Sequence, residues 1–155
     1  MPIFGAGPSG GSGGAWFSDP ISSLATVAEI RVWAGNVIDA VQFVHVDQAG
    51  AVVEQPRHGG LGGTLKTFAV GGARIFQISG RYGDLVDSMT ITVKRPRIGA
   101  EGDYSEAMAF GGDGGAADFT YLALPGYEIV GVCGRAGATV DAIGVVFRAL
   151  AERPA

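Results

Sequence analysis

The 155-residue chain contains only one cysteine, Cys133, so it cannot form an intrachain disulfide. Charged residues make up 17% of the sequence, and the net charge is −4 at pH 7. Nucleic acids and anionic membranes require a basic protein surface, and we therefore predict no nucleic-acid partner. The sequence also lacks an apolar stretch long enough to cross a bilayer, which predicts no direct membrane insertion.

Groups suited to catalysis and to metal ligation are scarce as well. The two histidines, His45 and His58, belong to no cluster of His, Cys and Asp with metal-ligand spacing. Residues 5–10 match the dinucleotide pattern Gly-x-Gly-x-x-Gly, but Pro8 interrupts them and too few residues precede them to form the required strand. We predict a protein that is not an enzyme and that uses no metal and no cofactor.

Targeting signals are absent from the sequence. The first residues lack the basic start and the apolar core of a secretory signal peptide. The only asparagine, Asn36, is followed by Val37 and Ile38, so it is not part of a glycosylation sequon. These features predict a cytoplasmic protein, or one released without a cleaved signal peptide.

Glycine is the residue in excess, with 27 copies, and many of them belong to a motif that occurs three times. Each copy of Gly-Gly-x-Gly-Gly precedes, by 28 to 30 residues, the aspartate of a Gly-x-x-x-Asp loop. The glycine motifs are residues 10–14, 59–63 and 111–115, and the aspartate loops are residues 35–39, 83–87 and 137–141. A fixed internal period indicates one structural unit repeated about an axis or along a stack.

Apolar residues flank the three aspartates at matching distances. They lie twelve and nine residues before each aspartate and two and four residues after it: Val27, Ile75, Ile129; Ile30, Ile78, Val132; Val41, Met89, Ile143; Phe43, Ile91, Val145. The period of two after each aspartate is typical of half-buried antiparallel strands. Each Gly-x-x-x-Asp loop is therefore predicted to be the turn of a hairpin.

Further strands and the lack of helices complete the prediction of the fold. Residues 68–70 and 119–122 are candidates for additional strands, and no window has convincing helical periodicity. We predict a single all-β domain over residues 1–155, with repeat units of roughly 10–55, 59–100 and 111–150. Three small units of short strands cannot each bury an apolar face alone, so we expect them to pack around a common axis.

The repeated loops have two possible roles. In the first, glycine supplies positive φ angles for tight turns, and each aspartate caps its own turn by bonding its backbone. In the second, each carboxylate accepts charge-assisted hydrogen bonds from neighbouring hydroxyls of a sugar, which approaches a glycine loop that has no Cβ atoms. Three copies at matched spacing favour the sugar site, although duplication alone would also preserve a structural turn.

The ordered glycine and aspartate motifs resemble those of the jacalin-related lectins. Residues 14–19 resemble the family's opening run of glycine, aromatic and acidic residues, and residues 137–144 resemble its closing Gly-x-x-x-Asp signature. The resemblance runs from Gly10 to about Leu150. It implies a β-prism I fold, in which three four-stranded Greek-key sheets surround a pseudo-threefold axis, and it implies a carbohydrate-binding function.

The family combines the Gly-x-x-x-Asp loop of one unit with the glycine loop of another unit in each sugar site. By resemblance, the carbohydrate-binding residues are Asp141, Gly137, Ala138, Thr139, Val140 and Gly14 in one site; Asp39, Asn36, Val37 and Gly63 in a second; and Asp87, Asp84, Leu85 and Gly115 in a third. Members that prefer galactose are cleaved before the opening glycine, whereas Gly14 lies within a continuous chain. The expected partners are therefore mannose- or glucose-type glycans, bound by one chain or by a homodimer that acts as an agglutinin.

One feature departs from the family pattern. Family loops often carry an aromatic residue that stacks on the sugar, but none of the three loop interiors has one. Trp33 and Tyr82, just outside two loops, are the candidates to replace it, and Asp84 adds a second negative charge at its site. This departure leaves an alternative open: a degenerate β-prism that serves as a protein-interaction or self-assembly module without binding sugar.

Overall fold

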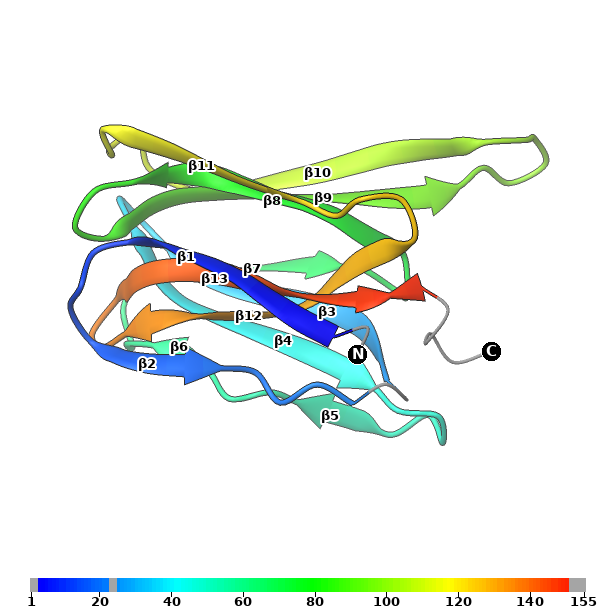
Figure 1. Ribbon diagram of the computed structural model, residues 1–155, viewed down its shortest axis with the longest axis horizontal. Helices are drawn as coiled ribbons and strands as arrows, with labels where there is room; N and C mark the ends of the chain where they lie inside the picture. Colours follow the sequence, from blue (N-terminus) through cyan, green and yellow to red (C-terminus); the bar gives the residue numbers. More distant parts are fainter. Residues whose placement is uncertain (1–2, 23–24, 151–155) are drawn as a thin grey trace.

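The chain forms three antiparallel sheets in a computed structural model that describes residues 3–22 and 25–150 (Figure 1). The first sheet has the order β1 (Ile3–Gly10), β13 (Val140–Ala149), β12 (Tyr127–Ala136) and β2 (Ala15–Ser18). The second has the order β10 (Asp103–Gly111), β9 (Val86–Pro96), β8 (Arg74–Tyr82) and β11 (Ala117–Leu122). The third has the order β5 (Val52–Glu54), β4 (Ile38–Val46), β3 (Thr26–Ala34) and β7 (Thr64–Ala69), and β6 (His58–Gly59) also pairs with β4.

The outer edge of β4 is covered by two short strands rather than by one. β5 pairs with residues 44–46 and β6 pairs with residues 40–41, so both occupy the same side of β4. Pro56 lies between them, and proline interrupts a ladder because it has no N–H to donate.

Within the described residues, no helix is long and apolar enough to span a bilayer.

Each sheet contains one hairpin and the two strands on either side of one glycine loop, and the third sheet also contains β5. The hairpins β3–β4, β8–β9 and β12–β13 carry the three Gly-x-x-x-Asp turns, as predicted. Each glycine loop links one edge of a sheet to the opposite edge: β6 to β7, β10 to β11, and β1 to β2. The loop thereby crosses the end of the hairpin that it flanks. In the second and third sheets the hairpin precedes its glycine loop in the chain, whereas in the first sheet the glycine loop at residues 10–14 comes first.

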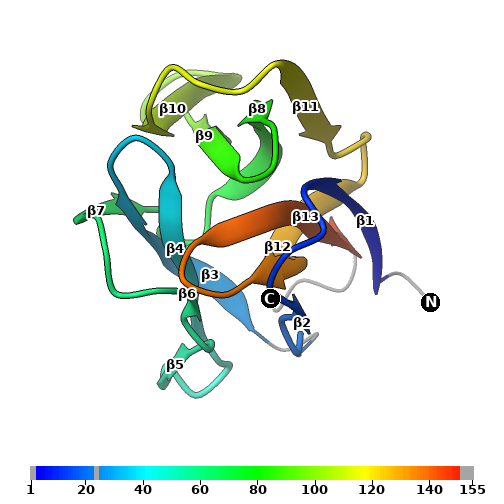
Figure 2. The same ribbon diagram turned by 90° about the vertical axis from the view of Figure 1, so that its left-hand side faces the viewer.

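The threefold repeat also extends to the register of the strands. In every hairpin the pairing shifts twice, once near its open end and once beside the turn, after Trp33, Arg81 or Arg135. Such irregularities bend a strand and increase its local twist. Because the shifts occur at matching places, the three turns leave their sheets in the same way, and all three lie at one end of the molecule (Figure 2).

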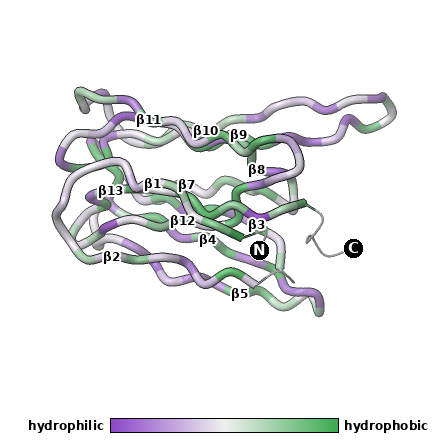
Figure 3. The backbone as a smooth tube through the Cα atoms, viewed as in Figure 1, coloured by the Kyte–Doolittle hydropathy of each residue, from purple (hydrophilic) through white to green (hydrophobic). Residues whose placement is uncertain are grey.

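A single hydrophobic core lies between the three sheets. The twelve apolar residues that repeat around the aspartates all belong to it, and each is at most 5% exposed. Short apolar and polar stretches alternate along the strands in Figure 3, as the period-two pattern requires. Cys133 is buried, and burial raises the pKa of its thiol to about 11.

A buried histidine links the third sheet to the first. His45 Nε2 lies 2.8 Å from the carbonyl oxygen of Val130, so this nitrogen carries the hydrogen. His45 Nδ1 accepts a hydrogen bond from the buried amide of Gln55 at 2.7 Å, and a neutral ring satisfies both contacts. The segment between β5 and β6 is thereby fixed to β4.

Acidification is expected to weaken the fold through His45. Burial lowers the pKa of His45, and Arg148 adds to this effect, while the Val130 carbonyl and Asp19 oppose it. Below about pH 6.5 the unfolded chain takes up a proton that the folded chain resists, so the free energy of unfolding decreases as the pH falls. Urea denaturation at about pH 7.5 and 5.5 measures this change. The His45→Gln variant should show a flatter profile, and equal stability of the natural chain at both pH values would contradict the prediction.

Candidate functional site

The three aspartates of the Gly-x-x-x-Asp turns lie against the three glycine loops at the end of the molecule shown in Figure 2. Each carboxylate faces the last two glycines of the loop that crosses its hairpin. We name the sites by their aspartates: the Asp141 site with Gly13 and Gly14, the Asp39 site with Gly62 and Gly63, and the Asp87 site with Gly114 and Gly115. These are the loop combinations that the resemblance implies.

Only glycine allows this approach between main chain and carboxylate. A Cβ atom on Gly14, Gly63 or Gly115 would lie 2.7, 2.6 or 2.9 Å from an oxygen of its aspartate. The same three glycines have φ angles of 69°, 81° and 93°, which other residues rarely adopt. The other oxygen of each carboxylate would meet a Cβ on the preceding glycine at 2.6 to 2.8 Å. Both carboxylate oxygens therefore lie over bare main chain.

The main chain fixes each loop on its hairpin. The second glycine of each loop donates its N–H to the carbonyl of the site aspartate, at 2.9 Å for Gly11, 3.0 Å for Gly60 and 3.0 Å for Gly112. The first glycine of each aspartate loop also donates to the carbonyl two residues later, at 2.9 to 3.1 Å. Backbone groups therefore hold both loops in place, and this positioning does not require the aspartate side chains.

The three carboxylates keep their acceptor capacity free. Across residues 3–22 and 25–150, none of them takes part in a hydrogen bond or an ion pair with another protein group. Asp47, in the turn after β4, behaves differently: its Oδ1 accepts the N–H groups of Ala49 and Ala51, both at 2.9 Å. Asp47 is a turn-capping aspartate, whereas the site aspartates, which are half-buried, leave their oxygens available to a ligand.

Arginines brace the glycine loops, a feature that the sequence analysis did not identify. Arg135 donates to the carbonyls of the Asp141-site loop, including that of Gly14 at 2.8 Å. Arg81 donates to the Gly115 carbonyl at 2.7 and 3.0 Å. A sequence signal did exist, because arginine stands six residues before the aspartate in two of the three copies.

The Asp39 site achieves the same bracing by another route. Trp33 occupies the matching position, and the guanidinium of Arg57 lies 3.8 Å from the centre of its ring. Arg57 Nη2 donates to the Gly60 carbonyl at 2.7 Å. One face of Trp33 is therefore already covered by protein, which reduces its use as a platform for a sugar.

Burial limits how much of several predicted site residues a ligand can contact. Tyr82 packs against the core beside Phe119, with ring centres 6.3 Å apart, and is half-buried. The Val140 side chain is fully buried, and only its main chain remains for the Asp141 site. The remaining loop-interior residues are at least partly accessible: Asn36, Asp84 and Ala138 are exposed, and Val37, Leu85 and Thr139 are half-buried.

Neighbouring sites share a direct backbone contact. A Cβ on Gly60, in the Asp39 site, would lie 2.0 Å from the carbonyl oxygen of Ala138, in the Asp141 site. Gly11 meets Asp84, and Gly112 meets Asn36, in the same way. Every glycine loop thus lies between its own aspartate turn and the turn of another site. The six loops form a closed ring.

The comparisons with known proteins agree on one family. Residues 6–146 match the family model described as "Jacalin-like lectin domain". The chain is 32% identical over 148 residues to an agglutinin of Castanea crenata, covering 91% of this chain and 45% of that protein. It is 31% identical over 145 residues to Horcolin of Hordeum vulgare, covering 89% of this chain and 92% of Horcolin. The chain therefore spans less than half of the Castanea protein but most of Horcolin.

A solved structure has the same architecture. It is a mannose-binding jacalin-related lectin from Ananas comosus, with a TM-score of 0.76 and 25% identity, and the match covers 96% of this chain and 99% of that one. The three antiparallel sheets around one core are therefore a β-prism I fold, and the predicted fold class is confirmed.

The contacts between neighbouring loops predict that two substitutions in one glycine loop, Gly60→Ala and Gly62→Ala, differ in whether they disturb the neighbouring site. Gly60→Ala collides with the Ala138 backbone, so it should shift the amide resonances of residues 137–139 in the neighbouring site and cost about 1–3 kcal/mol of stability. Gly62→Ala, the matched control, meets only the Asp39 carboxylate. It should leave those amides in place. Two-dimensional NMR of the free proteins checks this, and unchanged residues 137–139 in Gly60→Ala would contradict it.

Proposed function

Because the chain belongs to the jacalin-like lectin family, whose members bind carbohydrate and are not enzymes, we propose that it binds mannose- and glucose-type glycans through three sites. Asp39, Asp87 and Asp141 accept hydrogen bonds from sugar hydroxyls. The interiors of the Gly-x-x-x-Asp loops, residues 36–38, 84–86 and 138–140, supply main-chain N–H groups. The glycines opposite each aspartate give the sugar access to the backbone.

The observation that carries this proposal is the free carboxylate at each site. A half-buried carboxylate without a protein partner is held where both of its oxygens can accept charge-assisted hydrogen bonds. Two adjacent hydroxyls on a hexose present two donors at the spacing of the two oxygens. The mannose-binding relative from Ananas comosus supports mannose as the sugar to test first.

Three sites at one end of a single chain favour multivalent binding. Each site lacks an aromatic residue inside its loop, so the affinity of one site for a single sugar is expected to be low. Linked sites raise the overall avidity by roughly 10²–10⁴ when their geometry matches the target. Agglutination then follows from one chain, and a homodimer would double the number of sites.

Removing the three carboxylates should abolish glycan binding without unfolding the protein. The variant Asp39→Ala/Asp87→Ala/Asp141→Ala loses the acceptors but no internal hydrogen bond of those side chains. Titration calorimetry with methyl α-mannoside measures binding, and thermal unfolding measures the fold.

The matched control is Asp47→Ala, which removes two turn-capping hydrogen bonds. It should cost about 1–2 kcal/mol of stability and leave binding unchanged. The proposal fails if the triple variant binds the glycoside as tightly as the natural chain does.

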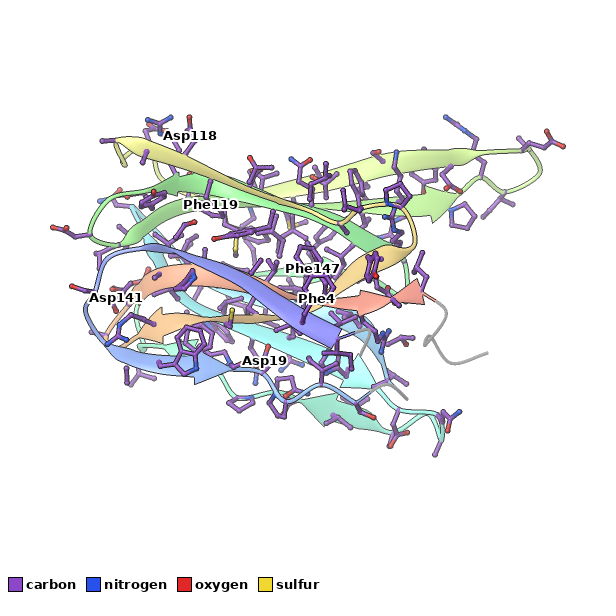
Figure 4. All side chains as sticks on the ribbon, viewed as in Figure 1. Phe4, Asp19, Asp118, Phe119, Asp141 and Phe147 are labelled. Atoms are coloured by element: carbon purple, nitrogen blue, oxygen red, sulfur yellow. The ribbon has the colours of Figure 1, made fainter. Side chains whose placement is uncertain are left out.

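The alternative, a protein-interaction or self-assembly module, also has one observation in its favour. Phe4, Leu122 and Leu124 are 48%, 51% and 65% exposed and line an apolar pocket with Phe147. Figure 4 shows Phe4 and Phe147 at a distance from Asp141 along the first sheet. If the chain binds no glycan on an array although circular dichroism shows that it is folded, the alternative function is favoured.

A further inference from the structure

The three sites share their carboxylate and glycines but differ at the middle residue of the glycine loop. This residue is Ser12 in the Asp141 site, Leu61 in the Asp39 site and Asp113 in the Asp87 site. It stands directly before the glycine that faces the carboxylate, so it lies at the border of the site in all three copies. Leu61 is 93% exposed, and its whole side chain is available for contact with a ligand.

A second position also differs between the sites, being apolar in the Asp39 site and acidic in the Asp87 site. The strand after each glycine loop places one residue opposite the residue six before the aspartate: Leu65 faces Trp33, Asp118 faces Arg81, and Trp16 faces Arg135. Directly opposite residues of an antiparallel pair point to the same face of the sheet. Leu65 is 46% exposed, so the Asp39 site has a second accessible leucine beside its loop.

Charge separates the Asp39 site from the Asp87 site. The Asp87 site has Asp84, Asp113 and Asp118 around it, and Asp118 pairs with Arg81 at 2.7 Å. The Asp39 site has one carboxylate in its two loops, and its nearby guanidinium, Arg57, is stacked on Trp33 and bonded to the loop carbonyl. The Asp39 site therefore has fewer carboxylates around it than the Asp87 site.

A single exposed leucine on a protein surface requires no explanation. Here, two exposed leucines lie near the same free carboxylate: Leu61 on a loop otherwise composed of glycine, and Leu65 on the strand that follows this loop. Contact with an apolar group of a ligand would remove their surface from water, which is favourable in proportion to the area covered. A hydroxyl-only sugar edge would not gain this contribution.

We propose that the Asp39 site selects glycans whose bound sugar carries an apolar substituent or aglycone, which packs on Leu61 and Leu65. The Asp87 site, with aspartates at both matching positions, has no such preference. This inference rests on the proposed function, since it assumes that Asp39 and Asp87 each bind a sugar.

The test compares methyl α-mannoside with benzyl α-mannoside in chains that keep one site each. Asp87→Ala/Asp141→Ala leaves the Asp39 site, and Asp39→Ala/Asp141→Ala leaves the Asp87 site. We expect the Asp39-site chain to bind the benzyl glycoside about tenfold more tightly, which corresponds to about 1.4 kcal/mol. The Asp87-site chain should bind both glycosides equally.

Reciprocal exchange of the middle loop residue provides the decisive control. Leu61→Asp in the Asp39-site chain should remove the preference and keep the affinity for methyl α-mannoside within about twofold, because Leu61 is on the surface. Asp113→Leu in the Asp87-site chain should create a preference for the benzyl glycoside. Circular dichroism verifies that each variant is folded.

The outcomes separate the two proposals. If the Asp39-site chain binds both glycosides equally, or if Leu61→Asp leaves the preference intact, the inference is overturned while the sugar sites stand. If the Asp39-site chain binds neither glycoside but the natural chain binds both, the inference is also overturned. If the natural chain binds neither, the proposed mannose-type function fails, and this inference fails with it.

Discussion

The close approach between a carboxylate and two successive glycines is the constraint on which the rest of the loop end depends. Any side chain on Gly14, Gly63 or Gly115 would occupy the place of the carboxylate oxygens and would be strained at the observed φ angles. The glycines are therefore explained both by the turn geometry and by the space that the aspartates need. The first interpretation of the repeat, a turn capped by its own aspartate, accounts only for the glycines. Asp47 shows what a capping aspartate looks like in this same chain.

The topology explains how a short chain builds three such contacts. A hairpin positions the aspartate, and the glycine loop that links its two flanking strands crosses the hairpin end. In the second and third sheets these parts are consecutive in the sequence. In the first sheet the glycine loop comes from the start of the chain and the hairpin from its end, so β1 and β2 close the prism on β13 and β12. The Asp141 site consequently exists only when both ends of the chain have folded together.

The sequence predicted the core and the loops better than it predicted their surroundings. The twelve repeated apolar residues are all buried, because strand periodicity and burial are local and regular. The roles of Arg81 and Arg135 depend on contacts with carbonyls far away in the sequence, and a sequence pattern does not distinguish such arginines from solvated ones.

The three copies also reveal which positions the structure constrains. Core residues and the glycines at the carboxylates vary little among the units, because a change there costs several kcal/mol or displaces a loop. Exposed positions such as Ser12, Leu61 and Asp113 carry almost no folding cost and have become chemically different. The fold therefore preserves one arrangement of carboxylate and glycine loop and leaves its border free to change. Under the proposed function, a repeated site with a fixed centre and a variable border would give three related specificities on one surface, which a strictly symmetric protein would not have.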